Sequence, residues 1–139
     1  MKYFLVLTLL VFVMAEGLGV NDGKLAPCPD TPNCVSTQAD AGDSEHYMPP
    51  IELSDAVSTD SIRELVEARA RTTIIEQTDS YLHAEFRSQV FRFVDDVEFY
   101  LDKEAGLLHF RSAARMGRSD LGVNRKRMGE LSAAIKSIR

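Results

Sequence analysis

The chain has 139 residues, of which 45% are hydrophobic and 27% are charged, and its net charge is −5. This length suits one domain with its own core, and the composition excludes a disordered or fibrous protein. The negative charge argues against nucleic acid as a partner, because nucleic-acid-binding proteins carry an excess of basic residues. A single folded domain is therefore expected.

An apolar segment, YFLVLTLLVFVMA, occupies residues 3–15 near the start of the chain. It is too short to cross a bilayer comfortably, which takes about 20 residues. It matches the hydrophobic part of a secretory signal peptide, with Val13 and Ala15 as an acceptable pair before a cleavage site. We assign residues 1–19 to a signal peptide or, alternatively, to an N-terminal anchor, with no stable transmembrane span after cleavage. The predicted location is exported, in the periplasm or cell envelope.

Cys28 and Cys34 come next and are the only two cysteines in the chain. Outside the cytoplasm, an even pair of cysteines usually forms a disulfide. Their spacing differs from the C-x-x-C of redox proteins, and a zinc site needs about four ligands. We favour a disulfide over free thiols or a metal site, and we predict no metal and no cofactor.

Residues 20–53 contain many Gly, Pro, Asp and Ser residues and show no apolar period. This composition predicts an extended N-terminal arm that lies over the domain, held by the cysteine loop and by apolar residues around Pro49 and Pro50. The folded domain is assigned to residues 54–139.

Two helices are predicted within residues 54–139. The sequence SIRE at residues 61–64 matches a capping box, and the apolar stripe that follows ends near Arg71. The second predicted helix spans residues 120–139 and can be capped by Ser119, Asp120 or Asn124. Its apolar stripe consists of Met128, Leu131, Ile135 and Ile138.

Four strands are predicted, at residues 72–75, 81–88, 90–102 and 107–114, because these segments are β-branched or alternate in polarity. Short turns between them favour an antiparallel meander with one face on the core and one in solvent. The expected fold is α+β and two-layered: a four-stranded, mostly antiparallel sheet with two helices packed on one face. The solvent face would carry cross-strand ion pairs or a polar ligand surface formed by His83, Glu85, Arg87, Arg92, Asp96, Glu98, His109 and Arg111.

Asp95 is unusual, because the alternation of residues 90–102 places it on the apolar side of its strand. A buried carboxylate is unfavourable unless it is paired or hydrogen-bonded. A bulge at Asp95 and Asp96 could turn it outward, or Arg111 or Arg115 could pair with it. The functional alternative is an acid with a raised pKa in a cleft.

Residues 111–127, RSAARMGRSDLGVNRKR, hold six basic residues where a strand ends, a loop follows and a helix begins. Backbone N–H groups, the helix dipole and arginines can together bind an anion, although a well-capped helix with solvated arginines fits as well. Three consecutive basic residues at 125–127 oppose the helix dipole, which suggests a carboxylate or an external anion nearby. The candidate ligand-binding residues are Arg111, Arg115, Ser119, Asp120, Asn124, Arg125, Asp95 and Asp96.

Three ordered blocks of the chain resemble the DUF1499 family: residues 28–36 (CPDTPNCVS), 91–99 (FRFVDDVEF) and 111–125 (RSAARMGRSDLGVNR). The resemblance extends from about Leu25 to the C-terminus. The family has no assigned function, so the resemblance supplies no catalytic residues. Bacterial members often look exported or tethered to a membrane, and plant members look targeted to plastids. The resemblance implies one motif set that consists of Asp95, Asp96, Arg111, Arg115, Asp120, Asn124 and Arg125.

The favoured function is therefore an exported, non-enzymatic envelope domain that binds a small anion or an envelope protein through the Arg-rich junction. One alternative is a hydrolase for an anionic envelope or lipid-derived substrate, with Asp95 or Asp96 as the acid or base. Another is a purely structural module. The sequence contains no nucleophile motif and no phosphate-binding loop.

Overall fold

The computed structural model describes residues 17–139, so the predicted signal peptide or anchor lies almost wholly outside the described residues. Within residues 17–139, no helix is long and apolar enough to cross a membrane. The elements in chain order are β1 (Cys34–Ser36), β2 (Ile51–Glu52), α1 (Thr59–Glu67), β3 (Thr72–Gln77), β4 (Tyr81–Arg87), β5 (Val94–Asp102), β6 (Leu107–Ala114) and α2 (Val123–Lys136).

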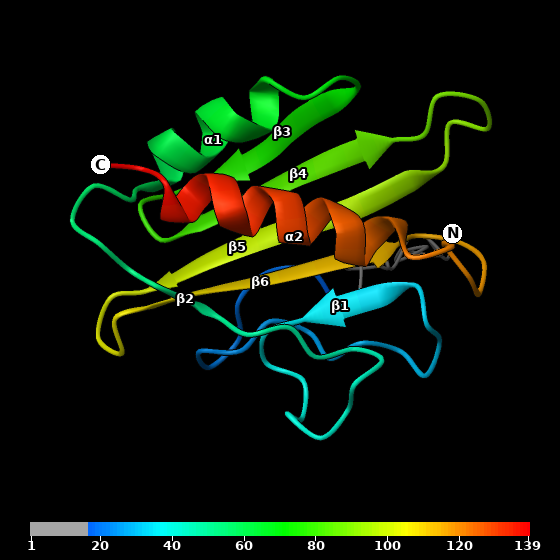
Figure 1. The fold of residues 1–139 in the computed structure, drawn as a ribbon, viewed down its shortest axis with the longest axis horizontal. Helices are drawn as coiled ribbons and strands as arrows, with labels where there is room; N and C mark the ends of the chain where they lie inside the picture. Colours follow the sequence, from blue (N-terminus) through cyan, green and yellow to red (C-terminus); the bar gives the residue numbers. More distant parts are fainter. Residues whose placement is uncertain (1–16) are drawn as a thin grey trace, which may run out of the picture.

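The fold is α+β, as predicted: one antiparallel sheet with α1 and α2 packed over the same face (Figure 1). The sheet has six strands, however, and not the predicted four. Its order is β1-β6-β5-β4-β3, and the short strand β2 also pairs with β6. The two additional strands come from the arm. They have three and two residues, which is too short to show an alternating pattern in the sequence.

The core lies between the sheet and the two helices. Alternate residues of β5, such as Val97 and Phe99, are fully buried on the helix side of the sheet, as the period of two requires. The apolar stripe of α2 packs against them, and Ile62 and Val66 complete the core from α1. The three stripe residues of α2 that are buried are Met128, Leu131 and Ile135.

Both helices begin at residues that differ from the predicted ones. The capping box joins Ser58 and Ser61, whose hydroxyls each accept from the other's backbone N–H, so α1 begins at Thr59. The second helix, α2, begins at Val123 because Gly122 adopts a left-handed conformation, with φ 79°, that a helix cannot continue through.

The long strand predicted at residues 90–102 begins only at Val94. Val94 is the antiparallel partner of Arg87, the last residue of β4, so residues 88–93 must form the connection. Phe91 and Phe93 therefore lie in a loop and are exposed, which corrects their predicted place beside Asp95 on the apolar face.

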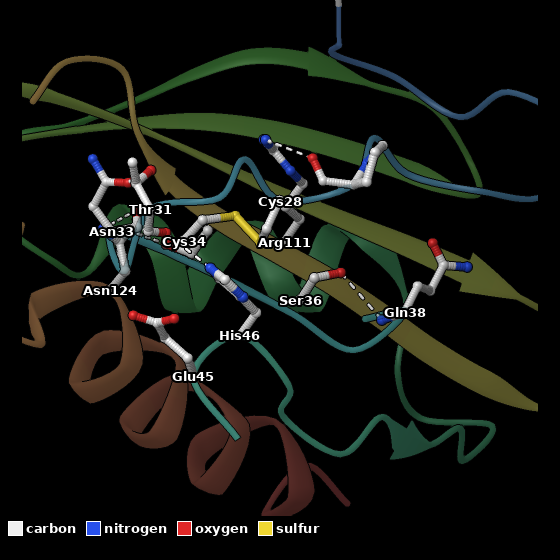
Figure 2. The surroundings of a disulfide bond; sticks show 12 residues. Cys28, Thr31, Asn33, Cys34, Ser36, Gln38, Glu45, His46, Arg111 and Asn124 are labelled. Carbon is white, nitrogen blue, oxygen red and sulfur yellow. Dashed lines mark hydrogen bonds between the residues drawn. A yellow bond between two sulfur atoms is a disulfide. The ribbon is translucent and has the colours of Figure 1, made fainter. Parts of the chain in front are cut away.

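The second face of the sheet is covered by the arm and does not face solvent as predicted. The backbone N–H of Gly19 donates to the Glu98 carboxylate over 2.7 Å, and both Glu98 and Leu25 are buried. The predicted disulfide between Cys28 and Cys34 is present and lies beside Arg111 on this face (Figure 2). We call this surface, beneath residues 17–38, the covered face.

Candidate functional site

On the covered face, Arg115 is held by two carboxylates. Its guanidinium donates to Asp96 over 2.7 and 3.1 Å and to Glu85 over 2.9 Å. His83 lies 2.8 Å from Asp96 on the other side. Burial alone would raise the pKa of Asp96, but the hydrogen bonds from His83 and Arg115 outweigh burial and lower the pKa to about 2. Asp96 is therefore ionised throughout the physiological range.

Arg111 is enclosed deeper under the arm, opposite Glu98. Its Nη1 atom lies 3.7 Å from Glu98 Oε1, and its Nη2 atom donates to the Pro27 carbonyl. Glu98 is fully buried and also accepts a hydrogen bond of 2.6 Å from the Tyr81 hydroxyl. Among the described residues, Glu98 Oε1 and Arg111 Nε have no hydrogen-bond partner. The two arginines predicted to bind an anion thus face carboxylates of the protein itself.

Asp95 lies on the helix side of the sheet, as predicted, but its partner is neither Arg111 nor Arg115. The strand alternation sends those two arginines to the opposite face, and α2 supplies Arg127 instead. The Arg127 Nη2 atom lies 2.7 Å from Asp95 Oδ2, and its guanidinium lies 4.7 Å above the Phe86 ring. This ion pair is largely buried, with 11% and 13% of the two side chains exposed.

The loop before α2 uses its polar residues to begin the helix. The Asp120 carboxylate accepts from the backbone N–H groups of Gly122 and Asn124, and hydrogen bonds of this kind lower its pKa against the opposing effect of burial. The Asn124 side chain is fully buried and hydrogen-bonds to Ser112 and Asp120. Ser119 accepts from the N–H of Leu121.

The three consecutive basic residues at the start of α2 have three different environments. Arg127 pairs with Asp95, and Arg125 donates to the backbone carbonyls of residues 44, 45 and 47. Lys126 is exposed and forms no side-chain hydrogen bond or ion pair with any residue from 17 to 139. Its ammonium is therefore available to an external anion.

Lys126 lines a cleft of about 420 Å³ that lies between α2, the α1–β3 turn and the end of β4. We call it the cationic cleft, because five of its lining residues are basic and only one is acidic. Phe86, Ala70 and Val123 form its apolar part. The charged lining residues are Arg69, Arg71, Arg87, Lys126, Arg127 and Glu130.

Three of the five basic residues of the cleft have carboxylate partners. Arg69 pairs with Glu130 over 2.7 Å, Arg87 with Glu85 over 3.2 Å, and Arg127 with Asp95. Arg71 donates only to the Arg87 carbonyl, and no ion pair to it forms within the described range. Arg71 and Lys126 thus form no ion pair within residues 17–139, although the Glu130 carboxylate in the same cleft attracts Lys126 at longer range.

A further cluster, Asp43, Glu45 and His46, has oxygen and nitrogen atoms close enough to hold a metal ion. The ring of His46 is already used, however: Nδ1 lies 2.7 Å from Asp43 and Nε2 lies 2.8 Å from the Thr31 carbonyl. The hydrogen bonds to Asp43 and Thr31 raise the pKa of His46, which favours the charged ring that donates to both acceptors. The cluster therefore has a structural role, because His46 connects Asp43 to Thr31 in the cysteine loop.

Sequence reasoning found one side of the cationic cleft and missed the other. The basic run at 125–127 indicated α2, but Arg69, Arg71 and Arg87 come from a turn and a strand that show no local signal for a site. Positive φ at Arg71, 58°, is visible only in the structure. Of the eight predicted ligand-binding residues, none lines the cleft.

The fold and these sites define a small α+β domain whose arm is stapled by a disulfide and whose one end carries a cationic cleft. The chain belongs to the DUF1499 family, described as a protein of unknown function, whose model matches residues 24–135. No curated protein and no solved structure matches the chain.

Proposed function

We propose that the protein is an exported, non-enzymatic domain that binds an anionic group in the cationic cleft. The observation that carries the proposal is the pair Arg71 and Lys126, which line one cleft from two different elements without carboxylate partners among residues 17–139. Phosphate and carboxylate groups are the chemical match, because a guanidinium binds two of their oxygens side by side.

The positive φ of Arg71 supports a functional role for the turn between α1 and β3. A non-glycine residue with positive φ costs on the order of 1 kcal/mol, and such strain gathers at binding sites. Here the conformation of Arg71 lets its Nε atom donate to the Arg87 carbonyl while the residue lines the cleft. The turn between α1 and β3 is thus tied to the end of β4, and this connection fixes the wall of the cleft to which Arg71 belongs.

The covered face is a weaker candidate for an anion, although a pocket of about 600 Å³ lies beside Arg111 and Arg115. A ligand there would compete with Asp96 and Glu85 for Arg115, and these two carboxylates, which line the pocket, would repel an anion. The anion-binding role that the sequence suggested for residues 111–127 is therefore better supported at Lys126, in the first turn of α2, than at Arg111 and Arg115.

The hydrolase alternative receives little support from the two aspartates. With its pKa lowered to about 2, Asp96 has no proton to donate at neutral pH. Asp95 is engaged with Arg127 at 2.7 Å. Both carboxylates line pockets, but each would have to leave its arginine before it could act as the acid or base on a bound ligand.

Titration of the protein with inorganic phosphate and with glycerol phosphate, followed by amide chemical shifts, tests the proposal. Saturable shifts are expected at residues 69–71, 86–87 and 123–130, and raised salt should weaken them. Arg71→Ala and Lys126→Ala should each reduce affinity about tenfold, since a hydrogen bond to a charged group contributes roughly 1.5 kcal/mol.

Lys136→Ala is the matched control, because it removes the same charge from the same helix, outside the cleft. Glu130→Gln should raise affinity by removing the one carboxylate that lines the site. Absence of saturable shifts, or an equal loss in Lys136→Ala, would refute binding at this cleft.

A further inference from the structure

One end of the molecule carries a group of large apolar side chains that are exposed to solvent. They come from the loop between β4 and β5, from the segment that joins β6 to α2, and from Val123, the first residue of α2. Leu121 is 95% exposed and Phe91 is 74% exposed, which is unusual for side chains of this size. We define the apolar tip as Val90, Phe91, Phe93, Met116, Leu121 and Val123.

Four residues of the apolar tip, Phe91, Phe93, Met116 and Val123, form a connected group. The rings of Phe91 and Phe93 stack with their centroids 5.5 Å apart. Phe93, Met116 and Val123 line the same pocket of about 330 Å³, which joins the two loops. A backbone hydrogen bond of 2.9 Å from Arg115 to Val94 fastens the bases of the loops together. This hydrogen bond keeps the two loops side by side, with their apolar side chains exposed to solvent.

The tip adjoins the cationic cleft. Val123 lines both the cleft and the pocket beneath the tip. The Asp95–Arg127 ion pair separates them, because Arg127 lines the cleft and Asp95 lines the pocket. An anion in the cleft would therefore lie beside the apolar tip.

The first described residues, Gly17 and Leu18, lie at this same end of the molecule. Gly17 and Leu18 line a pocket together with Ala114 and Arg115, at the end of β6 next to the tip. In Figure 1 the β4–β5 loop and the loop before α2 extend from the same end of the sheet. The apolar segment at residues 3–15 lies immediately upstream in the sequence, and the exposed basic residues Arg92 and Arg118 belong to the two loops of the tip.

We propose that this end docks on an anionic phospholipid bilayer, with the apolar tip in the interface and a lipid phosphate in the cationic cleft. This inference rests on the proposed anion binding of the cleft. Aromatic and aliphatic side chains next to basic ones are the composition that membrane interfaces favour, and basic residues near an anionic surface strengthen the binding. The apolar segment upstream would bring the same end to the membrane, whether before cleavage or as an anchor.

The absence of tryptophan from the sequence allows a direct test with the full chain. Phe91→Trp places the only tryptophan in the tip, and Ala105→Trp places it in the exposed turn at the far end of β5 and β6 as a control. Vesicles of phosphatidylcholine, with or without phosphatidylglycerol, are added, and emission is measured. Trp at position 91 should shift to the blue and be quenched by brominated acyl chains when phosphatidylglycerol is present, and the control should do neither.

Two further variants separate the two proposals, with Met116→Trp as the reporter. Phe91→Ser together with Phe93→Ser should abolish the vesicle response and leave the affinity for inorganic phosphate unchanged, because both side chains are exposed and outside the cleft. Lys126→Ala should weaken both responses about tenfold.

No blue shift at position 91, with phosphate binding intact, would overturn membrane docking and leave the cleft as a site for a soluble anion. Equal shifts at positions 91 and 105 would show adsorption without orientation and would also overturn it. A response that does not depend on phosphatidylglycerol would overturn docking on an anionic bilayer, because phosphatidylcholine carries a phosphate but no net charge. Unchanged phosphate affinity in Lys126→Ala would instead refute the cleft as the anion site.

Discussion

The covered face and the cationic cleft both contain arginines, but the arginines of the covered face lie against carboxylates, whereas two basic residues of the cleft form no ion pair within residues 17–139. On the covered face, Arg111 and Arg115 lie against Glu98, Asp96 and Glu85, and the arm shields most of these groups from water. In the cleft, Arg71 and Lys126 are exposed and have no carboxylate partner among the described residues.

This difference predicts a structural role for the charges of the covered face, and under the proposed function a binding role for those of the cationic cleft. A buried charge that is fully paired contributes little net stability, yet removal of its partner is strongly unfavourable. An exposed charge without an ion-pair partner costs little stability to remove, and under the proposed function the charges of the cleft bind a ligand instead. The same substitution should therefore have opposite consequences in the two regions, for stability in one and for binding in the other.

The largest effect is expected for Glu98→Ala. This change leaves the Tyr81 hydroxyl, the Gly19 N–H and the Arg111 guanidinium without their buried partner, and it should lower the free energy of unfolding by about 3–5 kcal/mol. Urea denaturation measures the change. Glu104→Ala, in the exposed turn after β5, is the control and should stay within about 0.5 kcal/mol of the parent protein. A small effect of Glu98→Ala would mean that the covered face is not a paired interior.

Asp96→Asn tests the same face through pH. The pKa of Asp96 is about 2 in the folded protein against 3.8 for the unfolded reference, so its stabilisation is complete above pH 3.8 and is lost as pH falls toward 2. At roughly 1.4 kcal/mol per pKa unit, about 2 kcal/mol is at stake at neutral pH. The variant should be less stable by about this amount at pH 7 and should lose less stability between pH 4 and 2. Parallel pH profiles for the two proteins would contradict the assignment.

Loss of the disulfide should make residues 17–38, which lie over the covered face, more mobile. Replacing Cys28 and Cys34 with serine is expected to cost roughly 2 kcal/mol, because the closed loop is short. Amide hydrogen exchange should then rise in residues 17–38 more than in α2. Uniform exchange across the chain would show that the disulfide stabilises the whole domain and not the arm in particular.

The smallest effect is expected for Lys126→Ala, which should change the free energy of unfolding by no more than about 0.5 kcal/mol, since its side chain lacks a partner within residues 17–139. Thermal unfolding without phosphate checks this. A loss of 2 kcal/mol or more would show that Lys126 is part of the architecture, and the contrast between the two regions would disappear.

Much of the fold could be predicted because its signals are local. The apolar period of α2 and the alternation of β4 and β6 depend on residues close in sequence, and these elements form close to where the patterns place them. The strands β1 and β2 could not be predicted, because each is too short to carry a period and exists only through pairing with β6.

The charged residues were harder to interpret, because their roles depend on which face they reach. Alternation correctly placed Asp95 on the apolar side, but its partner Arg127 is 32 residues away and comes from another layer of the fold. The predicted solvent face became an interior once the arm crossed it, which turned Arg111 and Arg115 from candidate ligands of an anion into partners of buried carboxylates.

The sequence by itself determined the α+β class, the stripes that form the core, the family and the short disulfide loop, because each depends on neighbouring residues. Only the tertiary structure decided the cationic cleft, the covered face and the apolar tip. Each of these joins elements that are far apart along the chain, such as Arg71 in a turn and Lys126 in the last helix. Charge and exposure belong to a position in the folded molecule, and that position exists only after the sheet, the helices and the arm have packed together.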